Sequence, residues 1–175
     1  MRLLSGEMAE GKDSLEELLG GARKHELEFD WLKAVDKYEI ALDLQEAKDR
    51  FTQGIILDSI SYARFKVAFQ SGSPEEFKAR IGKAIESCQK AKGFFDDCSD
   101  LKCKAWAKRC EATLAYLGFW QATDRKEKWD FLSKVWGLAK DSLIGFDDAR
   151  DGLEYCKTYL RLSMAGQMAL FSIRD

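Results

Sequence analysis

Apolar residues recur at spacings of three and four along most of this chain, which is the period of an amphipathic α-helix. The clearest helix start is Ser73, because Pro74 follows at the first helical position and Glu76 at the third. No segment shows the sustained alternation of apolar and polar residues that is typical of a strand. The pattern predicts an all-α fold of about seven helices. These are expected to begin near Ser14, Asp30, Asp49, Ser73, Ser99 or Asp100, Asp124 and Asp148.

The last two predicted helices carry long apolar stripes. Gly145 is expected to end the sixth helix, so that Asp147 and Asp148 lie at the positive end of the seventh. Asp96-Asp97 is likewise expected at a helix start. The predicted stripe of the sixth helix is Trp129, Leu132, Val135, Trp136 and Ala139. That of the seventh is Leu153, Cys156, Leu160, Met164, Met168 and Phe171.

Three helices share one spacing of apolar residues, at relative positions 0, 3, 7 and 10. The three copies are Trp31, Ala34, Tyr38 and Ala41, then Ile81, Ala84, Cys88 and Ala91, then Trp129, Leu132, Trp136 and Ala139. They recur about 50 residues apart, which suits a two-helix unit repeated in tandem. We therefore expect the aromatic rings of the first and third copies to be mostly buried between hairpins.

The first copy resembles the tetratricopeptide repeat (TPR). That family has a small residue in its first helix, a turn aspartate, and alternating aromatic residues and alanines in its second helix. The matching residues are Ala22, Asp30, Trp31, Ala34, Tyr38 and Ala41, followed by Leu42, within residues 15–45. Later units depart from the pattern, because their spacing exceeds the family's period of about 34 residues and 49–70 does not repeat the motif. The resemblance implies a TPR-like right-handed superhelix of antiparallel helical hairpins that binds proteins. The subclass that clamps C-terminal carboxylates uses asparagines, and this chain has none.

Length and composition fit one folded domain. The chain has 175 residues, of which 46% are hydrophobic, and its net charge is -2, so nothing attracts it globally to nucleic acid. Residues 1–12 are expected to be a flexible N-terminal lead, and 13–175 a single helical-repeat domain. No stretch reaches the roughly 18 apolar residues of a membrane span. Five cysteines without a close pair suggest reduced thiols, and hence a cytoplasmic protein.

Candidate chemical groups do not converge on an active site. His25 is the single histidine and is interpreted as a packing or surface residue. The cysteines lack zinc-ligand spacing and mostly lie on apolar stripes, although Cys98, near a loop, could be reactive. Basic residues near Trp106 and Trp129 could bind RNA, but acidic residues are interleaved with them. We expect no catalytic residue, no metal ligand and no cofactor, and hence no enzyme.

The leading functional hypothesis is a protein–protein interaction scaffold that binds a peptide or helix in a helical-repeat groove. The alternatives are a regulatory or sensory module of a larger signalling protein and an RNA-binding repeat. The apolar C-terminal helix makes Met164, Met168 and Phe171 candidate oligomer or domain interface residues. A following segment of a longer protein could cover them, or a second copy in a homodimer could. The remaining alternative is burial within a compact monomer.

Overall fold

The computed structural model describes residues 14–45 and 49–174. These residues form seven α-helices with their connecting loops, and none of them lies in a strand. The all-α prediction is confirmed, and the expected lead at 1–12 falls outside the described residues. The helices are α1 (Leu15–Leu27), α2 (Trp31–Leu44), α3 (Arg50–Ala68), α4 (Pro74–Asp96), α5 (Leu101–Gln121), α6 (Arg125–Asp148) and α7 (Gly152–Arg174).

Side chains at the helix starts explain why several boundaries fall where the sequence predicts them. The Ser14 hydroxyl accepts a hydrogen bond from the Glu17 amide, and the Glu17 carboxylate accepts one from the Ser14 amide. Ser73, Asp100 and Asp124 accept equivalent bonds at the starts of α4, α5 and α6. Each bond satisfies a backbone donor that has no partner within its helix.

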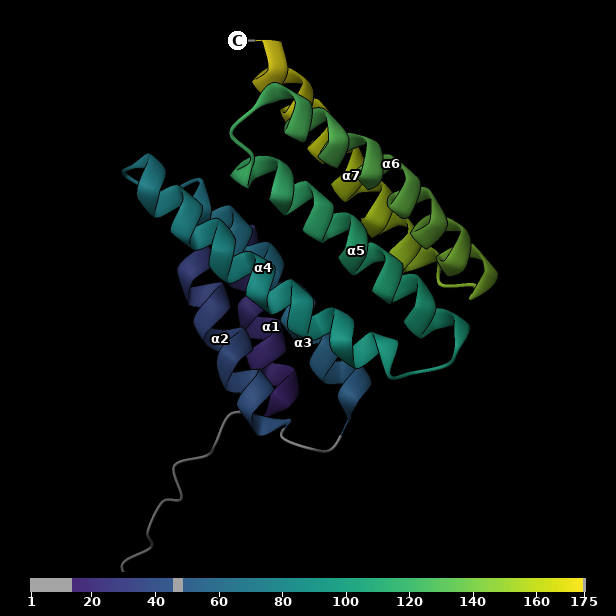
Figure 1. Cartoon of the computed structure of the whole chain (residues 1–175). Coiled ribbons are helices and arrows are strands. Elements are labelled where there is room, and N and C mark those ends of the chain that lie inside the picture. Colours follow the sequence, from purple (N-terminus) through teal and green to yellow (C-terminus); the bar gives the residue numbers. More distant parts are fainter. Residues whose placement is uncertain (1–13, 46–48, 175) are drawn as a thin grey trace, which may run out of the picture.

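The helices are stacked in chain order. Figure 1 shows the chain advancing from α1 and α2 at one side, through α3, α4 and α5, to α6 and α7 at the other. Each helix packs mainly against its neighbours in sequence, and α3 also touches α5. One main core runs through the stack and includes small residues such as Ala34, Ala84 and Ala91 that are fully buried.

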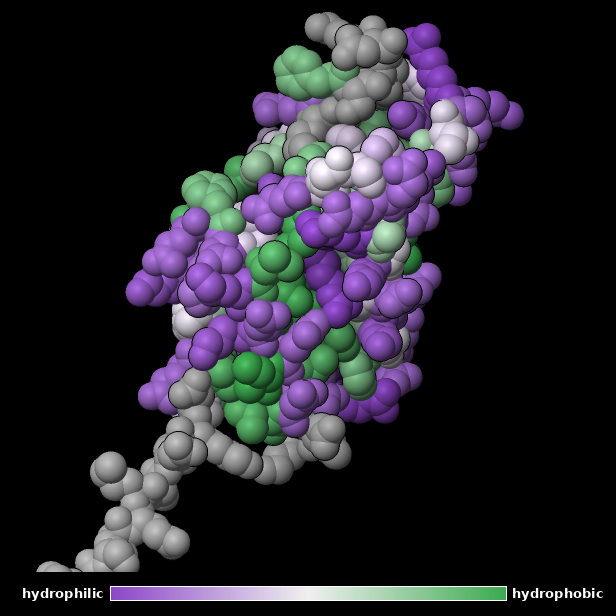
Figure 2. All heavy atoms as spheres, turned by 90° about the vertical axis from the view of Figure 1, so that its left-hand side faces the viewer, coloured by the Kyte–Doolittle hydropathy of each residue, from purple (hydrophilic) through white to green (hydrophobic). Residues whose placement is uncertain are grey.

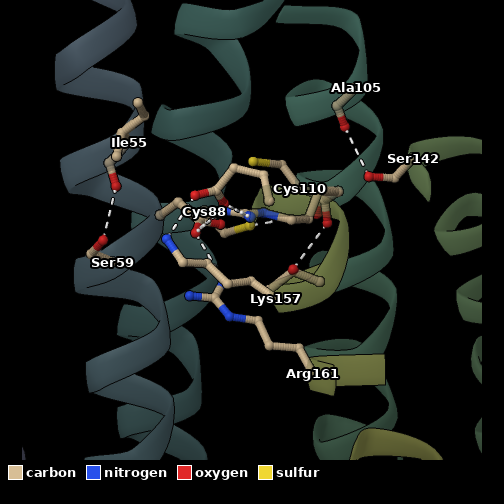
Figure 3. Close-up of polar contacts among 12 residues, drawn as sticks. Ile55, Ser59, Cys88, Ala105, Cys110, Ser142, Lys157 and Arg161 are labelled. Carbon is tan, nitrogen blue, oxygen red and sulfur yellow. Dashed lines mark hydrogen bonds and ion pairs between the residues drawn. The ribbon is translucent and has the colours of Figure 1, made fainter. Parts of the chain in front are cut away.

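Small residues bring α5 and α6 unusually close together. A Cβ atom on Gly145 would lie 2.9 Å from the Cβ of Ala105, so a larger residue there would force the helices apart. Ser142, one turn earlier, donates a hydrogen bond of 3.0 Å to the Ala105 carbonyl (Figure 3). Both contacts place the backbone of α6 directly on α5.

This close contact explains why the third copy of the repeat spacing is wrong in part. Leu132 and Ala139 are buried as expected, but Trp129 is 45% exposed and Trp136 is 62% exposed. The buried face of α6 uses Val135 in place of Trp136. An indole ring does not fit between helices held this close, whereas valine does.

Gly145 does not end α6, which runs three residues further to Asp148. The chain turns instead at Arg150, whose φ of 54° lies in the left-handed region. Asp147 and Asp148 therefore lie at the C-terminal end of α6, and Asp96 ends α4. The prediction that both aspartate pairs lie at helix starts was wrong. For Asp147 and Asp148 the reason is that a helical glycine with a packing role does not break its helix, and for Asp96 it is that α4 continues far enough to bury Phe95.

Candidate functional site

The apolar stripe predicted for α7 faces solvent. Leu153, Leu160, Met164 and Phe171 are 66%, 61%, 42% and 70% exposed, and Cys156 is exposed as well. We call these five residues the α7 stripe. The candidate interface residues Met164 and Phe171 belong to it, whereas the side chain of Met168 lies outside the described part of the chain. The alternative of burial in a compact monomer is therefore wrong for Met164 and Phe171.

The opposite, more polar side of α7 faces the rest of the molecule. Thr158 and Ala165 are buried, and Glu154 and Arg161 reach inward beside them. These residues share one helix face because they recur at spacings of three and four. The orientation of α7 is therefore explained by where its charged side chains find partners.

Those partners form a cluster of ion pairs at the centre of the fold. Asp58 of α3 and Arg109 of α5 are almost fully buried, and their Oδ2 and Nη2 atoms lie 2.6 Å apart. Arg109 Nη1 lies 2.7 Å from Oε2 of Glu154, and Arg161 Nη1 lies 2.9 Å from Oδ2 of Asp58. Figure 3 shows Arg161 extending from its helix into this cluster. We call Asp58, Arg109, Glu154 and Arg161 the ion-pair cluster.

The cluster stabilises the charged forms of its carboxylates. Burial acts to raise the pKa of Asp58, but the guanidinium groups of Arg109 and Arg161 outweigh it and hold that pKa below its usual value. At Glu154, too, burial acts to raise the pKa, but Lys157 and Arg109 outweigh it and lower that pKa. Both carboxylates are therefore charged at neutral pH, and breaking one pair leaves a buried charge without its partner.

A groove lies between α6 and α7 beside the α7 stripe. Its volume is about 520 Å³ and it is open to solvent on one side. Trp136, Leu143, Tyr159 and Leu162 are among the residues that line it. Trp136 and Tyr159 are 62% and 60% exposed, so two large aromatic side chains stand at its edges. We call this hollow the α6–α7 groove. Exposed aromatic residues beside an apolar groove are typical of protein interaction sites.

A second group of exposed apolar side chains lies on α1 and α2, and includes Leu27, Leu32 and Ile40. Figure 2 looks onto the left-hand side of Figure 1, where green groups are separated by hydrophilic side chains. These residues do not follow one side of a helix as the α7 stripe does. The α7 stripe and the α6–α7 groove therefore form the stronger candidate site.

Two of the five cysteines are joined, contrary to the expectation of no close pair. Cys98 precedes α5 and Cys103 lies in its first turn, and the helix start brings their Cα atoms to 5.8 Å in a disulfide. Donor atoms of these cysteines and of Asp100 all lie within 4.8 Å of one another. As long as the disulfide is formed, both sulfurs are occupied and neither is a thiolate that could bind a metal.

The other cysteines are free within the described chain, and Cys156 is exposed rather than on a buried stripe. Cys88 and Cys110 are buried, and the Cys88 thiol donates a hydrogen bond to the Cys110 carbonyl (Figure 3). The hydrogen bond with Cys88, together with burial, raises the pKa of Cys110. Cys110 is therefore a protonated thiol at neutral pH and a poor nucleophile.

Reducing the disulfide should lower the free energy of unfolding by about 2 kcal/mol, because it closes a short loop in the unfolded chain. Urea unfolding with and without a phosphine reductant measures the difference. In Cys98→Ser the reductant should have no effect, which serves as the control. Equal stability of the oxidised and reduced wild-type chain would contradict the expectation.

Three of the basic residues near Trp106 are engaged with acidic side chains. Lys102 Nζ lies 2.8 Å from Asp151, Lys108 Nζ lies 2.8 Å from Glu111, and Arg109 is buried in the ion-pair cluster. His25 is half-buried on α1, with Nδ1 3.6 Å from Glu28.

Sequence reasoning missed the ion-pair cluster, although two signals pointed to it. Asp58 interrupts an otherwise apolar run that contains Ile56, Leu57 and Ile60. Arg109 lies next to Cys110, on the apolar stripe of its own helix. A charge at a core position of a helix indicates a buried partner elsewhere in the fold.

Comparisons with known proteins add no family assignment. No helix in the described part of the chain is both long and apolar enough to pass through a membrane. No protein-family model, curated protein or solved structure matches the chain.

Proposed function

We infer that the chain is a protein–protein interaction scaffold of TPR-like helical hairpins, and that it binds an amphipathic helix of a partner protein along the α7 stripe. The observation that carries this proposal is the exposure of Leu153, Leu160 and Phe171 along one side of α7. Residues 153–171 span about 27 Å of helix at 1.5 Å per residue. A second helix could lie along that length and bury its apolar side.

The surroundings of the stripe support a protein partner. Trp136 and Tyr159 stand at the adjoining α6–α7 groove, and aromatic residues of this kind supply much of the binding energy at interfaces. The partner helix would need apolar residues at spacings of three and four to match the stripe. The proposal assigns the chain no catalytic role and keeps the expected cytoplasmic location, where the Cys98–Cys103 pair would be reduced.

A second copy of the chain is the other candidate partner. The stripe contains no charged residue, so two copies could pack their stripes together across a two-fold axis without repelling one another. The homodimer expected through the C-terminal helix would use Met164 and Phe171 in this way.

Replacing Leu160 by glutamate should abolish binding through the stripe, because a charge would be buried at the centre of the contact. Selection of amphipathic helices from a displayed peptide library should enrich binders with the wild-type chain. Their affinity should fall at least about tenfold with Leu160→Glu. Light scattering on the same samples reports any homodimer. Circular dichroism should show an unchanged fold, since Leu160 is 61% exposed.

The matched control is Leu27→Glu on α1, where Leu27 is 81% exposed. This variant should retain every selected helix. The proposal is wrong if no helix is enriched and the wild-type chain is monomeric, or if both variants reduce binding equally.

A further inference from the structure

A small cavity lies between α3, α5, α6 and α7, on the side of α7 that faces the core. Its volume is about 70 Å³, and Phe65, Leu117, Val135 and Ala165 are among its apolar walls. It is distinct from the α6–α7 groove, although Leu162 lines both. An apolar cavity of about 150 Å³ holds benzene, so this one suits a molecule no larger than benzene.

The charges that line the cavity are all positive. Lys66, Arg109 and Arg161 line it, and no carboxylate does among the described residues. Lys66 Nζ and Arg161 Cζ lie 5.3 Å and 4.5 Å from the centre of the Tyr62 ring, so the two cations share one aromatic neighbour. Asp58 and Glu154 pair with the two arginines, and Glu154 is shared with Lys157, which does not line the cavity, so one positive charge on the cavity wall remains without a carboxylate partner.

Lys66 is the source of that remaining charge. Within the described chain its ammonium group forms no ion pair and lies only over aromatic rings, those of Trp31 and Tyr62. Both arginines are paired, by contrast, and their positions are fixed by Asp58. One half-buried cation beside an apolar cavity favours a ligand with a single negative charge.

Two buried donors at the cavity have no hydrogen-bond partner in the described structure. They are the Thr158 hydroxyl and the Nε–H group of Arg109, on residues that are 2% and 3% exposed. Buried donors are normally satisfied, and an unpaired one costs free energy. Asp58 Oδ1 is also unpaired, but it is an acceptor and Asp58 does not line the cavity. Each of these two atoms exposes less than 1 Å², so a bound carboxylate would accept hydrogen bonds from them only after a small movement of the side chains.

We propose that this cavity binds a small monovalent organic acid, a carboxylate on a short apolar chain. The carboxylate would pair with Lys66, the short chain would contact the apolar walls, and a small side-chain movement would let Thr158 and Arg109 donate hydrogen bonds to the carboxylate. A phosphate dianion fits less well, because one uncompensated positive charge does not match two negative charges. The acid could be a free metabolite or an acidic side chain of a bound peptide, and we assign the free acid because the cavity is small.

Butyrate is the probe that tests this proposal, with butyramide as its neutral counterpart of the same shape. In a nuclear magnetic resonance titration, butyrate should cause saturable shifts in amides of α5 and α7 around Arg109 and Thr158. Butyramide should bind at least about tenfold more weakly, and so should butyrate to Lys66→Gln. Added salt should weaken butyrate binding. Lys104→Gln is the matched control, because Lys104 is exposed and does not line the cavity, and it should bind like the wild type.

Equal binding of butyrate and butyramide, or no saturable shift with butyrate at about 50 mM, would overturn the proposal. A peptide amide with one glutamate between two leucines tests the other source of a carboxylate. If the peptide binds and butyrate does not, the assignment to a free acid is wrong. Leu160→Glu should still bind butyrate, so failure of the interaction proposal can be distinguished from failure of this one.

Discussion

Replacing Asp58 by alanine is expected to lower the free energy of unfolding by about 3–5 kcal/mol, because it removes the shared partner of two arginines. Arg109 would keep only Glu154, and Arg161 would lose the carboxylate that holds it 2.9 Å away. The buried Arg109 guanidinium cannot lose its charge at ordinary pH, so it must remain desolvated with one carboxylate partner in place of two. Urea unfolding followed by circular dichroism measures the loss.

The matched control is Asp97→Ala, which removes an exposed ion pair with Arg50. Both side chains of that pair are more than half exposed, at 55% and 63%, so its loss should cost about 1 kcal/mol or less. Similar losses in the two variants would show that the ion-pair cluster does not hold α7 in place.

Acid titration examines the same cluster in the unmodified chain. The pKa values of Asp58 and Glu154 are lowered by folding, so their contribution to stability is fully present above their unfolded values of about 4. It is lost as the pH falls through the lowered folded values, because the carboxylates then gain protons. The stability of Asp58→Ala should therefore depend less on pH in this acidic range than that of the wild type.

Replacing Phe95 by alanine should also cost about 3–5 kcal/mol, because it opens a cavity at the junction of α3, α4 and α5. The Phe95 ring stacks on Trp106 at 5.2 Å and meets Phe51 edge-on at 5.7 Å. It also lies against the backbone of α3 at Gly54, where an added Cβ would come within 2.7 Å of the ring. Thermal and urea unfolding both measure the effect.

Trp129→Ala provides the contrast for Phe95→Ala. The Trp129 side chain is larger than that of phenylalanine, but it is 45% exposed, so its removal should cost about 1 kcal/mol or less. A large loss in Trp129→Ala would mean that the third copy of the repeat spacing packs as first expected, against its observed exposure.

The apolar pattern predicted the burial of α4 well, because size and hydrophobicity agree there. Ile81, Ala84, Cys88 and Ala91 recur at helical spacing, and all four are fully buried. On α6 the two properties conflict. Trp136 and Val135 are adjacent and both apolar, and the valine is buried because α5 lies too close for an indole ring. Hydrophobicity alone could not choose between them.

The orientation of α7 could not be read from its own residues. Its apolar side is as regular as that of any other helix, and local periodicity predicts that this side is buried. The polar side is turned inward by Asp58 and Arg109, which belong to helices much earlier in the chain. Which side of α7 is buried depends on its ion pairs with charged residues of α3 and α5. The apolar pattern within α7 does not predict those pairs.

The stacking of helices in chain order also determines how the molecule can fold. Most contacts join neighbouring helices, so they close short loops at a small entropic cost, and chains of this kind fold quickly. The Asp58–Arg161 contact is different, since it joins residues 103 positions apart. That contact can form only after the intervening helices have been arranged.

The C-terminal helix is therefore expected to be the last element to dock during folding and the first to open in the native state. Its buried face is narrow, and its amides should exchange with solvent faster than those of α3 to α5. Partner binding along the α7 stripe would slow this exchange, and so would a ligand that contacts Thr158. We therefore expect α7 to be the least stable helix of the fold. Binding of a partner to the α7 stripe and binding of a ligand at Thr158 would each prolong the time that α7 stays docked.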